Sequence, residues 1–222
     1  MESAFTFAIG DTHGCHKALL QMLEQCRDHA AGRRYRLIFI GDYIDRGPNS
    51  RAVVETLRGL AQRDPENVVC LMGNHEDMLL DAIDSGDPTH WLRNGGRDTL
   101  ASYGVRDPQE LPADDIAWFK SLRLSFDDGK RFFAHAGVDP DLPLDQQPKD
   151  ALLWIRGPFL RATRNYGRLI VHGHTPLEDA KPDVRANRVN IDTACVYGGV
   201  LTAAVFTNEA VGPVAFLSSK KR

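Results

Sequence analysis

The sequence has few cysteines and no long apolar run. Its four cysteines, Cys15, Cys26, Cys70 and Cys195, lie far apart without a Cys-x-x-Cys pair, which argues against a disulfide framework or a cysteine zinc site. No apolar run approaches the ~20 residues that cross a bilayer, and residues 1–4 contain no basic leader. We therefore expect a cytoplasmic protein without a signal peptide and without membrane contact.

A large excess of charge of either sign is also absent. The net charge is −3, so there is no electrostatic case for binding nucleic acid. A chain of 222 residues that is 42% apolar suits one compact domain. We expect a monomer with a single domain over residues 1–222, a helical insertion at about 87–122 and a frayed tail at about 218–222.

Short apolar runs recur along the chain, and several end in a polar turn. They predict strands at Phe5–Ile9, Leu37–Ile40, Val68–Met72, Arg131–Ala134 and Arg168–Val171. The first three are each followed by a predicted helix, which indicates βαβ units, whereas the later chain is richer in strands and includes a predicted hairpin at about 124–134. The pattern indicates an α/β fold but leaves open whether it is a doubly wound sheet or a sandwich.

The polar turns contain side chains that bind metals. Strands of an open α/β sheet present their carboxyl ends at one edge, so we expect these side chains around one cleft. The set combines carboxylates, imidazoles, one carboxamide and one guanidinium: Asp11, His13, Asp42, Asp45, Arg46, Asn74, His75, His135, His172 and His174. Such donors suit manganese, iron or zinc better than calcium or magnesium, and they suffice for two metals that share a carboxylate.

Each of these signals also has a structural alternative. Asp11 can cap a helix, Asn74 can occupy a turn, and His135 can be a hydrogen-bonded core histidine. Unrelated core histidines have no reason to fall repeatedly at strand ends beside glycines. The joint occurrence therefore favours a metal centre over three separate structural roles.

A dinuclear centre of this kind suits phosphoryl transfer. Two metals about 3.5–4 Å apart can activate a water and clamp both oxygens of an in-line displacement. The reaction also needs positive charge near the equatorial oxygens and a proton for the leaving group. Arg46 can supply the charge and His75 the proton, with Asp45 orienting the His75 ring.

Three of the turns resemble the signature motifs of a known family. They are similar to the GDxHG, GDxxDRG and GNHE motifs of the phosphoprotein phosphatase family and lie, in this order, at Gly10–Gly14, Gly41–Gly47 and Gly73–Glu76. That family is part of the calcineurin-like metallophosphoesterase superfamily. His-Ala-Gly at His135 and Gly-His-Thr-Pro at His174 match its downstream metal histidines. The stretches 91–96 and 190–193 also resemble its bacterial and phage branch, to which lambda phage phosphatase belongs.

The resemblance implies an α/β fold in which a β-sandwich of two mixed sheets is flanked by helices, with two divalent metals at one edge. The implied ligands are Asp11 and His13 for the first metal, Asp42 as the bridge, and Asn74, His135 and His174 for the second. His75 paired with Asp45 is the implied catalytic acid, and Arg46 and Arg156 are the implied phosphate ligands. Mn²⁺ is the expected metal, with iron or zinc as alternatives, and we expect structural or supporting roles for Glu76, His172 and Asp192.

The activity that the resemblance implies is serine/threonine protein phosphatase, with phosphotyrosine as a further substrate, acting on a phosphorylated protein or peptide by direct attack of a metal-bound hydroxide. The alternative is a symmetrical dinucleoside polyphosphate hydrolase, such as a diadenosine tetraphosphatase. Those relatives commonly lack the equivalent of Asp45 and have Asp in place of Glu76, which favours the phosphatase. A third hypothesis is a non-catalytic scaffold, but no expected ligand is missing.

Overall fold

The computed structural model describes residues 4–220. Strands and helices alternate first: β1 (Phe5–Ile9), α1 (His16–Ala30), β2 (Tyr35–Phe39), α2 (Ser50–Arg63), β3 (Val68–Cys70) and α3 (Asn74–Ser85). A helical segment follows: α4 (Thr89–Trp91), a π-helical turn (Leu92–Gly96), α5 (Arg97–Tyr103), a 3₁₀ turn (Pro108–Glu110) and α6 (Ala113–Ser121). The remaining elements are β4 (Ser125–Asp127), β5 (Arg131–Ala134), a 3₁₀ turn (Leu144–Gln146), α7 (Lys149–Trp154), α8 (Gly157–Arg161), β6 (Leu169–His172), β7 (Asp183–Val184), β8 (Arg188–Asn190), a 3₁₀ turn (Cys195–Tyr197), β9 (Thr202–Thr207) and β10 (Ala215–Ser218).

Within residues 4–220, the strands form two five-stranded sheets, each of which mixes parallel and antiparallel pairs. The first has the order β10-β9-β1-β2-β3, and the second has the order β4-β5-β6-β8-β7. In the first sheet, β1, β2 and β3 are parallel, while β9 runs antiparallel to β1. In the second, β5, β6 and β8 are parallel, and β4 pairs antiparallel with β5. The sandwich that the family resemblance implied is confirmed, as is the β4–β5 hairpin.

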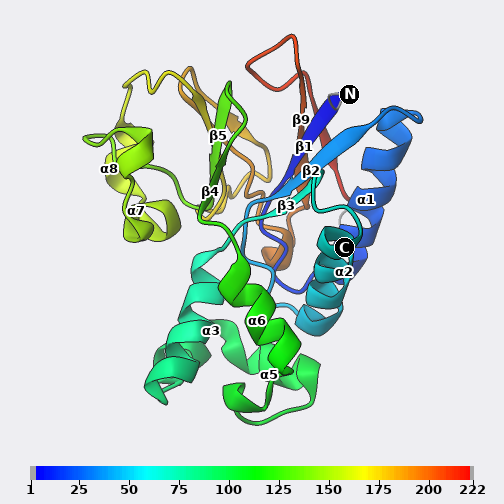
Figure 1. The fold of residues 1–222 in the computed structure, drawn as a ribbon, viewed down its shortest axis with the longest axis vertical. Coiled ribbons are helices and arrows are strands. Elements are labelled where there is room, and N and C mark those ends of the chain that lie inside the picture. Colours follow the sequence, from blue (N-terminus) through cyan, green and yellow to red (C-terminus); the bar gives the residue numbers. More distant parts are fainter. Residues whose placement is uncertain (1–3, 221–222) are drawn as a thin grey trace.

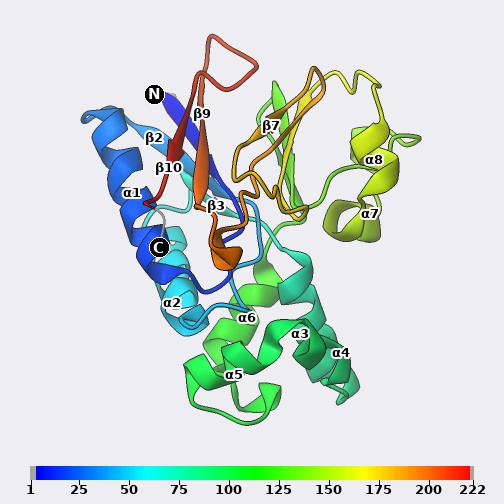
Figure 2. The same ribbon diagram turned by 180° about the vertical axis from the view of Figure 1, so that it is seen from behind.

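Alternation along the strands explains why the sheets stack. On β1, Phe7 faces the core beneath α1 and α2, whereas its neighbour Ala8 faces the second sheet. On β2, Phe39 and Ile38 divide in the same way, because successive strand residues point to opposite faces. A third core cluster lies on the other face of the second sheet and includes residues of β5, β6, α7 and α8. Figures 1 and 2 show the resulting layers, with α1 and α2 outside one sheet and α7 and α8 outside the other.

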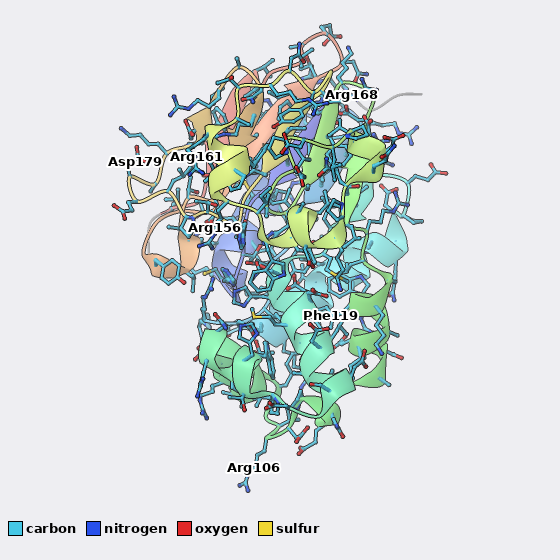
Figure 3. The ribbon with its side chains drawn as sticks, turned by 90° about the vertical axis from the view of Figure 1, so that its left-hand side faces the viewer. Arg106, Phe119, Arg156, Arg161, Arg168 and Asp179 are labelled. Carbon is cyan, nitrogen blue, oxygen red and sulfur yellow. The ribbon has the colours of Figure 1, made fainter. Side chains whose placement is uncertain are left out.

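The helices α3 to α6 lie together at one end of the sandwich. They form the lower part of the molecule in Figure 1, below the ends of β1, β2 and β3. Phe119 of α6 is fully buried, and Figure 3 shows from the side where it lies among these helices. These four helices therefore lie against the edge at which the strands end in the polar turns.

The structure differs from the sequence predictions in three places. The tail was predicted to fray from Ser218, but Ser218 ends β10, and the buried Ser219 exchanges hydrogen bonds of 2.8 and 2.9 Å with the backbone of Leu201. That prediction is wrong for residues 218–220, and residues 221–222 lie outside the described residues, as do residues 1–3. The short strand β7 and the helices α7 and α8 were not predicted.

No helix of the described part of the chain is long and apolar enough to cross a membrane.

Candidate active site

The turns after β1 and β2 lie side by side and bring two motifs into contact. The backbone N–H groups of Thr12 and His13 donate to the carbonyl oxygen of Asp42 at 3.1 and 2.8 Å. His13 and Asp42 both have left-handed backbones, with φ of 42° and 54°. Gly47 is required here because a Cβ on it would overlap the carbonyl oxygen of His13. Strained, tightly packed turns of this kind hold side chains in fixed directions.

Asp42 lies at the centre of the site. Its Oδ2 is 3.3 Å from Nε2 of His13 and 4.0 Å from Nε2 of His75, and its Oδ1 is 3.4 Å from Nε2 of His135. Burial opposes ionisation of this carboxyl, but the neighbouring histidines outweigh burial and hold its pKa well below the usual range. A carboxylate that presents one oxygen to each of two histidine groups suits a bridging metal ligand.

Two potential metal sites share Asp42. One consists of His13, Asp42 and His75, and the other consists of Asp42, His135 and His174, with the ligand atoms of each within 4.8 Å of one another. All five side chains are buried. Asn74 adds a further donor to the second site, since its Oδ1 lies 2.8 Å from Nε2 of His135 and 2.9 Å from Nδ1 of His174.

Backbone carbonyls set the orientation of two of these histidines. Nδ1 of His13 donates to the carbonyl of Ile44 at 2.8 Å, and Nδ1 of His135 donates to the carbonyl of Ile40 at 3.0 Å. In the neutral imidazole, each ring then presents the lone pair of Nε2 to the cluster. A hydrogen bond from the distal ring nitrogen to a carbonyl is the usual arrangement of a metal-binding histidine.

Asp11 has an unsatisfied oxygen that fits a metal ligand. Its Oδ2 accepts the N–H of His174 at 3.0 Å, but its buried Oδ1 has no hydrogen-bond partner. Burial, together with the negative charges of Asp192 and Asp42, raises the pKa of Asp11 well above its usual value. An unpaired buried carboxylate oxygen is costly, and a divalent cation would remove that cost by favouring the charged form. The donor set and this oxygen therefore fit a dinuclear metal centre.

His75 and Asp45 form a buried pair at the edge of the cluster. Nδ1 of His75 lies 2.6 Å from Oδ2 of Asp45, and both side chains are almost fully buried. Burial raises the pKa of Asp45 to about 7 and lowers the pKa of His75 to about 3. Because Nδ1 is occupied by Asp45, only Nε2 of the ring is directed toward the metal cluster.

The two arginines contact opposite ends of the cluster. Nη1 of Arg46 is 2.7 Å from Nε2 of His13, while Arg156 donates from Nε to Nε2 of His174 at 3.1 Å and from Nη2 to its carbonyl at 3.2 Å. Figure 3 shows Arg156 at the level where the sheets meet the helical segment, whereas Arg161 lies higher. Arg156, which the family resemblance implies as a phosphate ligand, thus lies beside the predicted metal ligand His174.

Three expected supporting residues occupy different positions. Glu76 is buried, and its carboxylate accepts the N–H groups of Asp42, Tyr43, Ile44 and Gly73 at 2.8 to 3.3 Å. It therefore joins the second and third motif turns. His172 packs against Phe159 with a ring-centre distance of 5.0 Å and belongs to neither metal group. Asp192 accepts the N–H of Ala194 at 3.1 Å and acts on Asp11 through its charge.

Sequence reasoning missed the residues that hold Asp45. Nε1 of Trp91 donates to both carboxylate oxygens of Asp45, at 3.1 and 2.9 Å, and Oγ1 of Thr99 donates to Oδ1 at 2.6 Å. Ser50 accepts the N–H of Asp45 at 3.1 Å. The stretch 91–96 resembles the bacterial and phage branch of the family, but nothing local in it indicates contact with a residue 46 positions away.

A sandwich with two histidine–aspartate groups that share one carboxylate at its edge defines a dinuclear metallohydrolase. The chain belongs to the calcineurin-like phosphoesterase family, whose model matches residues 6–205. It is therefore a metallophosphoesterase, and its similarity to serine/threonine phosphatases is consistent with the phosphoprotein phosphatase family.

Relatives of two specificities resemble the chain to a similar degree. It is 34% identical to the bis(5'-nucleosyl)-tetraphosphatase PrpE [asymmetrical] of Anoxybacillus flavithermus, covering 88% of this chain and 87% of that protein. It is 32% identical to serine/threonine-protein phosphatase 1 of Salmonella typhimurium, covering 89% and 90%. A solved structure provisionally assigned as a diadenosine tetraphosphatase superposes with a TM-score of 0.73 at 22% identity, covering 98% and 95%. This last similarity concerns the fold alone.

Proposed function

We propose that this metallophosphoesterase is a serine/threonine protein phosphatase whose substrate is a phosphorylated protein or peptide. The observation that carries the proposal is the buried pair of His75 and Asp45, whose Nδ1 and Oδ2 atoms lie 2.6 Å apart, next to Arg46. An alkoxide is a poor leaving group, so hydrolysis of phosphoserine benefits from a positioned acid. That the protein acts as a cytoplasmic monomer stays a prediction.

The residues divide the chemical work between them. Two divalent cations, which we propose to be Mn²⁺ with iron or zinc as alternatives, would be held by Asp11, His13, Asp42, Asn74, His135 and His174. When bound, they supply an activated water and neutralise phosphate charge. Arg46 and Arg156 would bind the phosphate oxygens, as guanidinium groups do.

His75 would then donate a proton from Nε2 to the leaving oxygen. Burial lowers the pKa of His75 to about 3. An arriving phosphate dianion brings negative charge close to the ring and thereby favours the imidazolium form. Asp45 holds Nδ1 and stabilises the charged ring, so the proton that is transferred comes from the nitrogen facing the substrate.

A second candidate is hydrolysis of a dinucleoside tetraphosphate. Two exposed aromatic rings lie beside the site: Tyr197 is 61% exposed with its ring centre 5.7 Å from the guanidinium carbon of Arg46, and Trp154 is 39% exposed with its ring 6.1 Å from that of His174. Exposed aromatic rings next to phosphate-binding groups are suited to stacking nucleobases. The similarity to PrpE supports the same candidate.

A direct competition separates the two. The metal-stripped protein, with Mn²⁺ added back, is offered a phosphoserine peptide and diadenosine tetraphosphate in parallel, and the metal-stripped protein alone is the control. A clear preference for the peptide supports the phosphatase. A clear preference for the dinucleotide contradicts it and moves the enzyme to nucleotide turnover, whereas no activity on either, with two metals bound, favours the scaffold.

A further inference from the structure

We propose that Trp91 and Thr99, from the helical segment, are positioning residues for the leaving-group acid, because they fix the Asp45 carboxylate that in turn orients His75. The proposal rests on the acid role of His75 in the proposed function. It does not depend on whether the natural substrate is a phosphoprotein or a dinucleotide.

The carboxylate of Asp45 is held on every side. It is fully buried, and its four hydrogen-bond contacts come from His75, from Thr99, and from the Trp91 indole N–H, which is shared between both oxygens. A buried carboxylate needs such partners, because each unpaired lone pair would add a desolvation cost. Because both carboxylate oxygens are hydrogen-bonded, Trp91 and Thr99 determine the direction in which Oδ2 of Asp45 faces His75.

Thr99 holds Asp45 at two points. Its Oγ1 accepts the backbone N–H of Asp45 at 2.8 Å, and the same hydroxyl donates to Oδ1 at 2.6 Å. The first bond uses a lone pair, which leaves the hydroxyl proton free for the carboxylate. Asp45 has φ of 72°, an uncommon backbone conformation for a residue other than glycine, and the clamp compensates for that strain.

The same segment also contacts Arg46 through a glycine. The N–H of Arg46 donates to the carbonyl of Gly95 at 3.2 Å, and Gly95 has φ of 108°. A Cβ on Gly95 would lie 2.7 Å from Cγ of Arg46. Gly96 leaves room for the Trp91 ring, which a Cβ there would approach to 2.5 Å. Trp91 thus contacts Asp45, and the backbone of the π-helical turn contacts Arg46, the next residue of the second motif.

The leaving group supplies the test. An alkyl phosphate such as a phosphoserine peptide needs a proton on its departing oxygen, whereas 4-nitrophenyl phosphate releases a stable phenolate and needs little help. Loss of the acid should therefore reduce turnover of the peptide far more than that of the aryl ester. Simple damage to the site would reduce both equally.

We would measure kcat on both substrates for Trp91→Phe, which keeps the bulk but removes the N–H, and for Thr99→Val, which replaces the hydroxyl at nearly constant volume. Each should lose about 10-fold or more on the peptide but less than about 3-fold on the aryl ester, as expected for partial loss of an acid worth ~10²–10⁴-fold. Thr99→Ser, which retains the hydroxyl, should restore the wild-type ratio. Trp118→Phe in α6 is the matched control, and metal content should be unchanged in all of them.

Several results would overturn the proposal. These are equal losses on both substrates, loss of metal from Trp91→Phe or Thr99→Val, or a Thr99→Ser variant as impaired as Thr99→Val. If Trp91→Phe fails to fold, Thr99→Val still decides. His75→Asn is the reference variant. If it shows no selective loss of activity on the peptide, the acid role of His75 in the proposed function is wrong. If His75→Asn shows that selective loss but Trp91→Phe and Thr99→Val do not, only the present inference is refuted.

Discussion

The backbone N–H of His174 donates to Oδ2 of Asp11 at 3.0 Å, which ties the second sheet to the first although 163 positions separate the two residues. Gly173 makes the approach possible, because a Cβ on it would overlap Oδ1 of Asp11. Gly173→Ala should therefore displace the carboxylate, weaken metal binding and lower the free energy of unfolding by ~1–3 kcal/mol, as overpacking does. Metal content and denaturant unfolding would be measured together.

Gly212→Ala is the matched control for that change. A Cβ on Gly212 meets nothing within 4 Å, and its backbone does not need a positive φ. Both the metal content and the unfolding free energy of this variant should equal those of the wild type. Full metal binding by Gly173→Ala would contradict the position of Asp11 in the metal centre.

Substitution of Asp42 and substitution of His75 should have different effects on metal content. His75→Asn removes the acid but leaves Asp42 in place, so kcat should fall by ~10²–10⁴-fold while metal content stays nearly intact. Asp42→Asn removes the carboxylate between the two histidine groups and should lose metal as well as activity. Metal content would be measured by elemental analysis after gel filtration, and equal metal content in the two variants would count against the bridging role.

The exposed rings beside the arginines should reveal substrate preference. If nucleobases stack on Tyr197, then Tyr197→Ala should raise KM for diadenosine tetraphosphate by about 5-fold or more, since one base-stacking contact is worth ~1–3 kcal/mol. KM for a phosphoserine peptide should change little. Tyr197→Phe is the control, because it retains the ring. An identical change for both substrates would remove the nucleotide-stacking role.

Alkaline pH should destabilise the protein through two buried thiols. Burial raises the pKa of Cys26 and of Cys70 from 9.0 to about 12. Above pH 9 the unfolded chain loses these protons while the folded chain keeps them, so the folded state binds more protons and stability falls as pH rises from 9 toward 12. Chemical denaturation at a series of pH values would measure the slope.

Cys26→Ala separates this effect from other alkaline titrations. The variant should be less stable at neutral pH because of the small cavity, but its stability should fall less steeply above pH 9. In the native protein, Cys26 and Cys70 should react with a thiol reagent only after unfolding, because the reactive thiolate is disfavoured. Rapid labelling of either residue at pH 8 would contradict their burial.

Local patterns predicted the strands that end in polar turns and the helices that follow the first three of them. The runs before Asp11, Asp42 and Asn74 were recognised because apolar strands of this length have few alternatives, and the glycine-bounded turns after them marked the site. The hairpin at β4 and β5 followed from Asp127-Asp128-Gly129 in the same way. The sequence therefore predicts that the ten side chains of the polar turns share one cleft, because strand ends meet at one edge.

The missed features depend on contacts that are distant in the sequence. The helix α8 has only five residues, with Pro158 in its first turn, where proline is tolerated, so it is too short for a helical period to show in the sequence. Ser219 is ordered by Leu201, and Trp91 is placed by Asp45, and neither contact leaves a periodic signal. β7 comprises only two residues, too few for any pattern. The family resemblance, rather than periodicity, separated the sandwich from the doubly wound sheet.

The pairing of β1 with β9 has a consequence for synthesis on the ribosome. Phe5 lies opposite Thr207 and Ile9 opposite Ala203, so one of the first strands to be translated waits for one of the last. Chains translated at about 5–20 residues per second would leave β1 without this neighbour for ~10–40 seconds. Asp11 and His13 follow β1 directly, so we expect the nascent chain to gain its complete metal centre only after β9 has been translated, and chains that lack β9 should not act on phosphate esters.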